Sequence, residues 1–390
     1  MVFSIERRKQ DIQALKEETL DVLIIGGGIT GAGTALQASA SGLKTGLVEM
    51  QDFAEGTSSR STKLVHGGLR YLKNFDVEVV ADTVQERAVV QGIAPHIPKA
   101  DPMILPIYDE PGSTFSMFSL KVAMDLYDQL ASVTGTKYAN YTLTKEEVLK
   151  RVPQLKSEGL LGAGVYLDYR NNDARLVIEN IKRAAADGGH MVSHMKVVGI
   201  LHDETNKVSG ATVEDALTGE TFDIKARVVL NTTGPWSDTI RQMDTKLDAV
   251  PQMRPTKGVH LVVDRKKLHV PQPIYFDTGK NDGRMVFVIP REEKTYFGTT
   301  DTDYKGDFAH PTVEQEDVDY LLEIINNRYP SADITIDDIE SSWAGLRPLI
   351  SANGGSDYNG GNSKPIKDES FDKVISTIEQ FQKGEVDRYT

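Results

Sequence analysis

The chain has 390 residues, and its 44 Lys and Arg against 57 Asp and Glu give a formal net charge of −13. This length suits about two domains, and the 39% hydrophobic and 26% charged fractions argue against wholesale disorder. The acidic balance argues against nucleic acid as a partner, while the absence of cysteine excludes disulfides, thiolate metal sites, iron–sulfur clusters and a cysteine nucleophile.

The N-terminal segment, residues 1–20, is charged and amphipathic, which predicts a helix and not the apolar core of a secretory signal. No apolar run approaches the ~20 residues needed to span a bilayer, so we expect a cytoplasmic protein without a membrane span. The amphipathic helix leaves peripheral membrane contact open, although its mixture of acidic and basic side chains is a poor match to anionic lipid.

Helices and strands alternate in the first part of the chain. Residues 21–25, 29–41 and 45–49 predict a buried strand, a closely packed Ala- and Gly-rich helix and a second strand, which together form a βαβ unit. The later elements that we expect, in chain order, are a helix over 75–94, a helix that begins in a capping box of Thr144 and Glu147, a helix over 174–187 capped by Asp173, a strand over 191–201, a hairpin of 208–214 and 220–230, strands at 259–263, 284–289 and 295–299, and a helix over 313–327. The polar, turn-rich segment from Ser351 onward predicts a mobile tail.

The turn between the first strand and the next helix carries the spacing G-x-G-x-x-G. Gly26 permits the tight turn, Gly28 lets the backbone approach a pyrophosphate, and Gly31 lets helix and strand pack closely. The helix N-terminus then supplies amide donors for the phosphates. Glu49 ends the second strand, where an acidic side chain accepts a hydrogen bond from a ribose hydroxyl. This order of a strand, three glycines, a helix, a second strand and a glutamate predicts a dinucleotide-binding unit.

Two further segments favour FAD over NAD, which the fingerprint alone does not separate. A second apolar strand, 228–234, ends in small residues and a glycine, and a second approach to the same dinucleotide suits a deeply buried flavin. The loop 56–70 is rich in hydroxyl side chains and places His66, two glycines and Arg70 close together. A plain surface loop would not need this combination, so we expect the loop to belong to the site.

These segments resemble the motifs of the FAD-dependent glycerol-3-phosphate dehydrogenase and oxidase family, and more closely those of the α-glycerophosphate oxidases of lactic-acid bacteria. The resemblance runs from about Asp21 to Pro348. It rests on motifs in family order, namely IIGGGITGAG (24–33), KLVHGGLRYL (63–72), NDARL (172–176), NTTGPW (231–236), GTTD (298–301) and GLRPL (345–349).

The fold class that this resemblance implies is α/β, with a glutathione-reductase-type FAD-binding domain and a discontinuous, strand-rich substrate domain. The expected FAD-binding parts are 18–95, 160–250 and 340–350, and the expected substrate-binding parts are 96–159 and 251–339. The family's later Gly-Gly-Lys segment and helical C-terminal domain are not found in this chain. We therefore expect residues 351–390 to be a mobile polar insertion or tail, with the sequence stopping inside it.

The activity that the resemblance implies is oxidation of sn-glycerol 3-phosphate to dihydroxyacetone phosphate, with FAD as the hydride acceptor. Its oxidase branch passes the electrons to O₂ and makes hydrogen peroxide, and its dehydrogenase branch passes them to membrane quinone. The closer likeness to the oxidases favours O₂. We expect a homo-oligomer, a dimer, and no metal.

The candidate base is His66, because an imidazole titrates near neutral pH, at about 6.5. A hydrogen bond to flavin or backbone is the alternative role for His66, and His260 is the rival base. Arg70 and Arg347 are candidates for the phosphate, because a guanidinium matches two phosphate oxygens. Further expected substrate residues are Lys257, Tyr71 and Thr300.

The expected cofactor residues lie in the three segments that approach the dinucleotide and in one later strand. They are Gly26, Gly28, Gly31, Glu49, Thr57, Ser58, Ser59, Ser61, Lys63, Leu64, His66, Gly67, Gly68, Val197, Thr233, Gly234 and Trp236.

Three other classes of protein fit these motifs less well. A nicotinamide dehydrogenase would share the fingerprint but would not need the His66 loop, and an amino-acid oxidase of related fold would bind a carboxylate instead of a phosphate. A flavoprotein without activity would have no reason to cluster His66, Arg70 and Arg347. Asp301 and Asp303 lack further ligands at metal-binding spacing, so we expect a solvated turn there.

Overall fold

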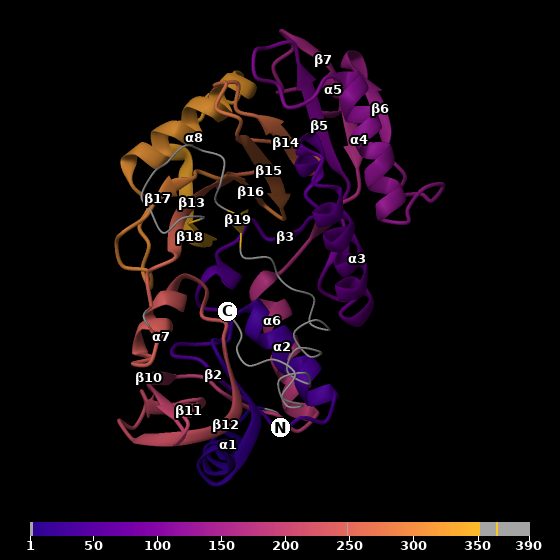
Figure 1. Ribbon diagram of the computed structural model, residues 1–390. Coiled ribbons are helices and arrows are strands. Elements are labelled where there is room, and N and C mark those ends of the chain that lie inside the picture. The colour runs from indigo at the N-terminus through magenta and orange to yellow at the C-terminus, as the bar shows by residue number, and fades with distance from the viewer. Residues whose placement is uncertain (1–2, 248, 352–363, 366–390) are drawn as a thin grey trace.

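The computed structural model describes residues 3–247, 249–351 and 364–365, and most of the tail expected over 351–390 lies outside these residues. Its chain builds two large sheets with helices on their faces, one at either end of the view in Figure 1. The fold is mixed α/β, which confirms the expected class. Among the described residues, no helix is both long and apolar enough to cross a membrane.

The first sheet has six strands and grows from the predicted βαβ unit. β1 runs parallel to β2 on one side and to β12 on the other, while β10 to β12 form an antiparallel meander. In spatial order the strands are β10 (Met195–His202), β11 (Val208–Asp215), β12 (Thr221–Asn231), β1 (Thr19–Ile25), β2 (Thr45–Val48) and β9 (His190–Val192).

Helices α2 (Ile29–Ala40) and α6 (Asp173–Ala186) cover one face of this sheet and contact each other (Figure 1). Three buried alanines on α2, at positions 32, 35 and 38, allow the close approach that its composition predicts. The predicted apolar face of α6 is buried as expected. Helix α1 (Ile5–Glu17) contributes Leu15 to a second apolar cluster. This cluster also contains side chains of β1 and of the β10–β12 meander.

The second sheet has ten strands and carries the rest of the core. In spatial order they are β19 (Lys364–Pro365), β18 (Ile339–Ile350), β13 (Met253–Asp264), β16 (Lys294–Gly298), β15 (Met285–Arg291), β14 (Ile274–Asp277), β5 (Met103–Tyr108), β7 (Leu160–Tyr166) and β6 (Tyr141–Thr144), with β17 (Thr302–Asp303) also paired to β13.

Helices lie on both faces of this larger sheet. α8 (Gln315–Arg328) packs in one apolar cluster with strand residues such as Leu261, while α4 (Met117–Leu130) and α3 (Val77–Ile93) share another with Leu105. The remaining helices are α5 (Lys145–Arg151) and α7 (Ser237–Met243). A small sheet joins β3 (Leu64–Val65), β8 (Tyr169–Arg170) and β4 (Lys99–Ala100).

The predicted elements are present, with three differences. Asn172, and not Asp173, accepts the capping hydrogen bond of α6, because Asp173 is occupied by Lys63. The strand expected over 191–201 is two strands, β9 and β10, separated where His194 adopts a φ of 54°. Hydrogen bonding places β7 and β18 in the ten-stranded sheet, although the expected boundaries count 160–166 and 340–350 with the FAD-binding domain. The division into domains otherwise stays a prediction.

Candidate functional site

The glycine turn between β1 and α2 closes on the loop that follows β12. A Cβ at Gly31 would lie 1.9 Å from the carbonyl oxygen of Gly26, and one at Gly26 would lie 2.7 Å from that of Thr232. These two positions therefore need glycine for packing alone. A Cβ at Gly28 would meet only the Ser58 side chain, at 3.1 Å, so it would enter a cradle in front of the helix.

Ser58 and Glu49 hold amides of the glycine turn. Ser58 Oγ accepts from the backbone N–H of Ile29, the first residue of α2, at 2.9 Å. Glu49 follows β2, and its Oε2 accepts from Gly27 N at 2.7 Å. Burial raises the pKa of Glu49, against the opposing effect of its bonds to backbone amides. A carboxylate and a hydroxyl thus stand on either side of the turn where the sequence predicts a ribose and a pyrophosphate.

Most other hydroxyls of the predicted cofactor loop are engaged within the protein. Thr57 Oγ1 donates to the Leu346 carbonyl at 2.7 Å, and Ser61 Oγ donates to Asp173 at 2.8 Å. Lys63 pairs with the same carboxylate and donates to the Ser59 carbonyl at 2.8 Å. These contacts hold the loop against α6 and β18. The side chains that make them therefore support the loop and are not free to bind a ligand.

The remaining predicted cofactor residues lie in three places. Thr233 and the 3₁₀ turn Gly234–Trp236 stand against the glycine turn, because the Thr233 Cα would be 3.1 Å from a Cβ at Gly26. This confirms that the end of β12 approaches the fingerprint. Leu64 lies in β3 and is half-buried. Val197 is buried in the apolar core of the first sheet, and its part in binding a cofactor stays a prediction.

A buried polar network holds the His66–Gly68 turn. The backbone N–H of Gly67 donates to both the Tyr127 hydroxyl and Asp168 Oδ1, at 3.0 Å each. Arg87 Nη1 donates to the same two oxygens, at 2.7 Å each. A Cβ at Gly67 would lie 2.3 Å from the Tyr127 hydroxyl oxygen, which explains the glycine. Sequence reasoning missed Arg87, Tyr127 and Asp168, because only their burial in the fold reveals them.

His66 presents its side chain at the surface beside β15. The side chain is exposed, and its ring lies 6.2 Å from that of Phe287 on β15. Desolvation nevertheless lowers the pKa of His66, with the Asp168 carboxylate acting in the opposite direction. Both observations fit an imidazole that is free to meet a ligand and neutral near physiological pH.

His260 is buried, with only 2% of its surface exposed. Its ring stacks on Trp343 at 4.6 Å, its Nε2 is 3.1 Å from Thr62 Oγ1, and its Nδ1 has no hydrogen-bond partner among the described residues. Burial, with Arg347 and Lys63 acting in the same direction, lowers the pKa of His260 to about 3. His260 is thus a weak base in this environment.

The register of β13 on β18 separates two groups of predicted substrate residues. Thr256 lies opposite Arg347 and His260 opposite Trp343, so both pairs share one face of the sheet. Lys257 projects from the other face, where its Nζ lies 2.6 Å from Asp317 on α8 and only 2% of the residue is exposed. The expectation that Lys257 binds substrate is therefore corrected, because this cation stabilises the packing of α8.

Thr300 also differs from its expected role. Its hydroxyl accepts from the Val259 amide at 3.1 Å and lies in a residue that is 2% exposed. The neighbouring Thr299 is the one whose hydroxyl contacts the Arg347 guanidinium. The prediction of Thr300 as a substrate donor is corrected, since its hydroxyl is used to bond the backbone of β13.

Arg347 and Arg70 form the centre of a cationic cluster. Arg347 Nη1 lies 3.2 Å from the Asp301 carboxylate, and its Nη2 donates to the Thr300 carbonyl at 3.2 Å. Burial lowers the pKa of the Arg347 guanidinium, and although Asp301 opposes this, the like charges of Arg284 and Arg70 add to it. Arg70 is exposed, with its guanidinium 5.9 Å from the Tyr71 ring. The cluster holds more positive than negative charge, which suits an anionic ligand.

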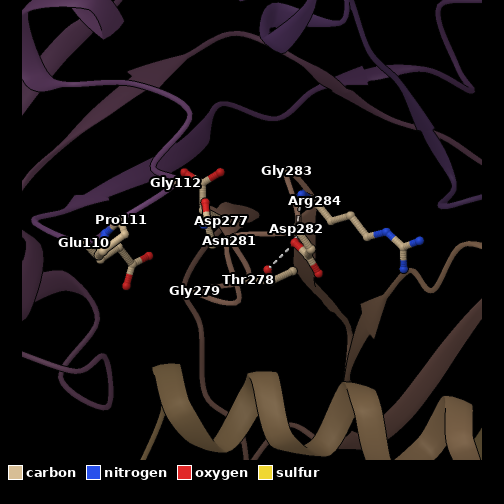
Figure 2. Close-up of a pocket in the computed structure, with 10 residues that line it drawn as sticks. All are labelled: Glu110, Pro111, Gly112, Asp277, Thr278, Gly279, Asn281, Asp282, Gly283 and Arg284. Atoms are coloured by element: carbon tan, nitrogen blue, oxygen red, sulfur yellow. Dashed lines mark hydrogen bonds between the residues drawn. The ribbon is translucent and has the colours of Figure 1, made fainter. Parts of the chain in front are cut away.

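Arg284 also lines a small surface depression, and Figure 2 shows the residues around it. Its carboxylates are already engaged, Asp277 with the Thr114 amide at 2.9 Å and Asp282 with the Thr278 hydroxyl at 2.7 Å. Within the described ranges, no group of three or more His, Asp or Glu side chains is arranged to hold a metal ion.

The buried His260 makes the stability of the fold depend on pH. Because folding lowers its pKa to about 3, the unfolded chain binds the proton first as the pH falls, and the stability present above about pH 6.5 is progressively lost. Between pH 7.5 and pH 5 this group should cost about 2 kcal/mol. Urea unfolding of the wild type and His260→Gln at both pH values measures it. An equal loss of stability in the two proteins would contradict the burial of a neutral imidazole.

Comparison with known proteins gives three kinds of likeness. The family model of the FAD dependent oxidoreductases matches residues 21–369. The α-glycerophosphate oxidase of Enterococcus casseliflavus is 71% identical over 388 residues, covering 100% of this chain and 64% of that protein. The α-glycerophosphate oxidase of Lactococcus lactis is 63% identical over 384 residues, with 98% and 63% covered.

Among solved structures, the glycerol-3-phosphate dehydrogenase of Bacillus halodurans complexed with FAD superimposes with a TM-score of 0.78. It is 39% identical, and the match covers 98% of this chain and 68% of that one. The chain thus spans less than two thirds of the length of the two oxidases that it resembles.

Proposed function

The chain belongs to the FAD-dependent oxidoreductase family, and from this premise we propose that it binds FAD and oxidises sn-glycerol 3-phosphate to dihydroxyacetone phosphate, with O₂ as the electron acceptor. The single observation that carries the substrate is the partly buried cluster around Arg347, whose excess positive charge suits a phosphate ester. The likeness to two α-glycerophosphate oxidases supports the acceptor. We keep the homodimer as a prediction.

The residues present fit FAD. The space in front of Gly28 is a cradle that a Cβ would fill, and the Ile29 amide points to a serine hydroxyl that a pyrophosphate oxygen can replace. Glu49 stands at the end of β2 with its carboxylate beside the turn. When bound, FAD supplies the acceptor for the hydride that leaves the carbinol carbon of the substrate.

The chain's own residues would then do three things. The phosphate is held by the guanidinium groups of Arg347 and Arg70, which fixes the orientation of the alcohol. A ring nitrogen of His66 takes the hydroxyl proton while the C–H bond breaks, leaving a ketone and an imidazolium. Tyr71, next to Arg70, can donate its hydroxyl hydrogen to the substrate. Each turnover removes two electrons and two protons, which O₂ receives to become hydrogen peroxide.

Replacing Arg347 with glutamine should weaken binding of sn-glycerol 3-phosphate by about 2 kcal/mol, roughly 30-fold, because a charge-assisted pair is lost. Plain glycerol, which has no phosphate, should be affected much less. Titration of the flavin spectrum with each compound measures both constants. Equal losses for the two compounds would mean that Arg347 supports the fold or the flavin instead.

The acceptor is tested on the FAD-loaded protein. We expect sn-glycerol 3-phosphate to bleach the flavin without oxygen, and air-saturated buffer to restore its colour with formation of hydrogen peroxide. Slow reoxidation over many minutes, combined with rapid turnover on added quinone, would replace the oxidase by a quinone-linked dehydrogenase. A flavin that the substrate does not bleach would overturn the proposed function altogether.

A further inference from the structure

Arg284 is a cation of the site that the sequence motifs do not include. It directly precedes β15, and its Nη2 donates to the backbone carbonyl of Asp301 at 2.9 Å. Figure 2 shows its side chain extending away from the other lining residues of the depression. Its charge is therefore directed toward the Asp301 turn and not into that depression.

The Asp301 turn is also what holds Arg347. Residues 299–301 engage one edge of the Arg347 guanidinium through a hydroxyl, a carbonyl and a carboxylate. These contacts use three of the five N–H donors of a guanidinium, which leaves two for a ligand as far as the described residues go. A Cβ at Gly258 would lie 2.9 Å from Nη2, so the glycine there provides room for the guanidinium. One residue, Asp301, thus contacts both arginines.

The charges around this turn do not balance. Arg347 and Arg284 both interact with the Asp301 carboxylate, Arg284 also interacts with Asp282, and the positive charge of Arg70 acts on Arg347 as well. Of the two carboxylates, Asp282 already accepts from the Tyr320 hydroxyl at 3.0 Å and from the Arg284 amide at 3.0 Å. An excess positive charge that is partly removed from water is stabilised by an anion with several acceptor oxygens.

We propose that Arg284 is a positioning residue for a phosphate subsite: it fixes the Asp301 turn that orients Arg347, and so sets the affinity of the site for phosphate monoesters. The inference rests on the proposed function for the identity of the substrate. It goes beyond that function in assigning the phosphate affinity to a pair of arginines that act through one aspartate.

The test compares the wild type, Arg284→Gln, Arg347→Gln and the double variant. Arg183→Gln is the matched control, because Arg183 is exposed on α6 and pairs only locally with Asp187. Calorimetric titration with inorganic phosphate gives a readout that needs no turnover, and flavin reduction by sn-glycerol 3-phosphate gives KM and kcat separately. A further single variant, Arg284→Lys, keeps the positive charge but not the paired N–H donors of the guanidinium.

We expect Arg284→Gln to weaken phosphate binding about tenfold and to raise KM by a similar factor with little change in kcat. In the Arg347→Gln background, Arg284→Gln should weaken phosphate binding by less than a further factor of about two. The reason is that Arg284 acts on the phosphate through Asp301 and Arg347. Arg284→Lys should recover part of the affinity, and Arg183→Gln should match the wild type.

Two results would overturn the proposal: unchanged phosphate affinity in Arg284→Gln, or a full tenfold loss in the Arg347→Gln background as well. Failure of the proposed function looks different. In that case the wild type binds phosphate, and loses it on Arg284→Gln, but sn-glycerol 3-phosphate does not reduce the flavin.

Discussion

Replacing Gly28 with valine is expected to give a folded protein that retains no FAD. The structure leaves space at this position, since a Cβ would meet only the Ser58 side chain. The added isopropyl group would then occupy the cradle in front of the first amides of α2, where the pyrophosphate must approach the backbone. Flavin absorbance of the purified protein measures the loss, and circular dichroism measures the fold.

Two other glycines serve as controls for this change. Gly31→Ala should lose both FAD and stability, because its Cβ would lie 1.9 Å from the Gly26 carbonyl oxygen. Gly92→Ala should keep both, because no described atom outside its own helix lies within 4 Å of the added Cβ. A Gly28→Val protein with a full complement of FAD would contradict the assignment of the turn.

Replacing His66 with glutamine is expected to slow reduction of the flavin by roughly 10²–10⁴-fold, the usual contribution of a general base. Substrate affinity should change far less, because the proposed phosphate contacts are made by Arg347 and Arg70. Stopped-flow reduction by sn-glycerol 3-phosphate measures the rate. Glutamine keeps the size and a hydrogen-bonding group, so the Gly67 turn and its contacts with Tyr127 and Asp168 should survive.

The pH dependence of this rate supplies a second check. A base works when neutral, and the environment lowers the pKa of His66, so the rate should stay high into mildly acidic solution and fall only below that lowered pKa. The fall should vanish in His66→Gln. His310→Gln is the control, as His310 is exposed and pairs with Asp307. If His260→Gln slows reduction while His66→Gln does not, His260 is the base.

The parts of the fold that the sequence predicts well are those with local signals. The glycine turn, the helix with the Thr144 capping box and the hairpin over 208–230 each depend on neighbours within a few residues. The sequence does not predict β18 and β5 as strands, because both contain residues that are unfavourable within a strand. β18 contains Gly345 and Pro348, β5 contains Pro106, and both are strands only because distant partners pair with them.

The site shows the same limit at the level of side chains. Motifs predict Arg347 and Gly28 as site residues, and the structure leaves space in front of Gly28 and surrounds Arg347 with other charged groups. Lys257 belongs to a motif as well, but the alternation of β13 turns it to the opposite face from His260. Its register could not be known without the partner strand. Arg284 lies in none of the sequence motifs, and its contact with Asp301 in the structure is what indicates a role at the site.

The central position of β1 has a consequence for how the chain is made. β1 pairs with β2 on one side, but its other neighbour, β12, lies roughly 200 residues farther along the chain. At the usual 5–20 residues per second of translation, β1 waits about 10–40 s for that strand to leave the ribosome. During this time the strand has an open, apolar edge, which is where nascent chains aggregate. Production of this protein should therefore depend on chaperones that shield the growing chain, and co-expression of such chaperones should raise the soluble yield more than a change in final buffer does.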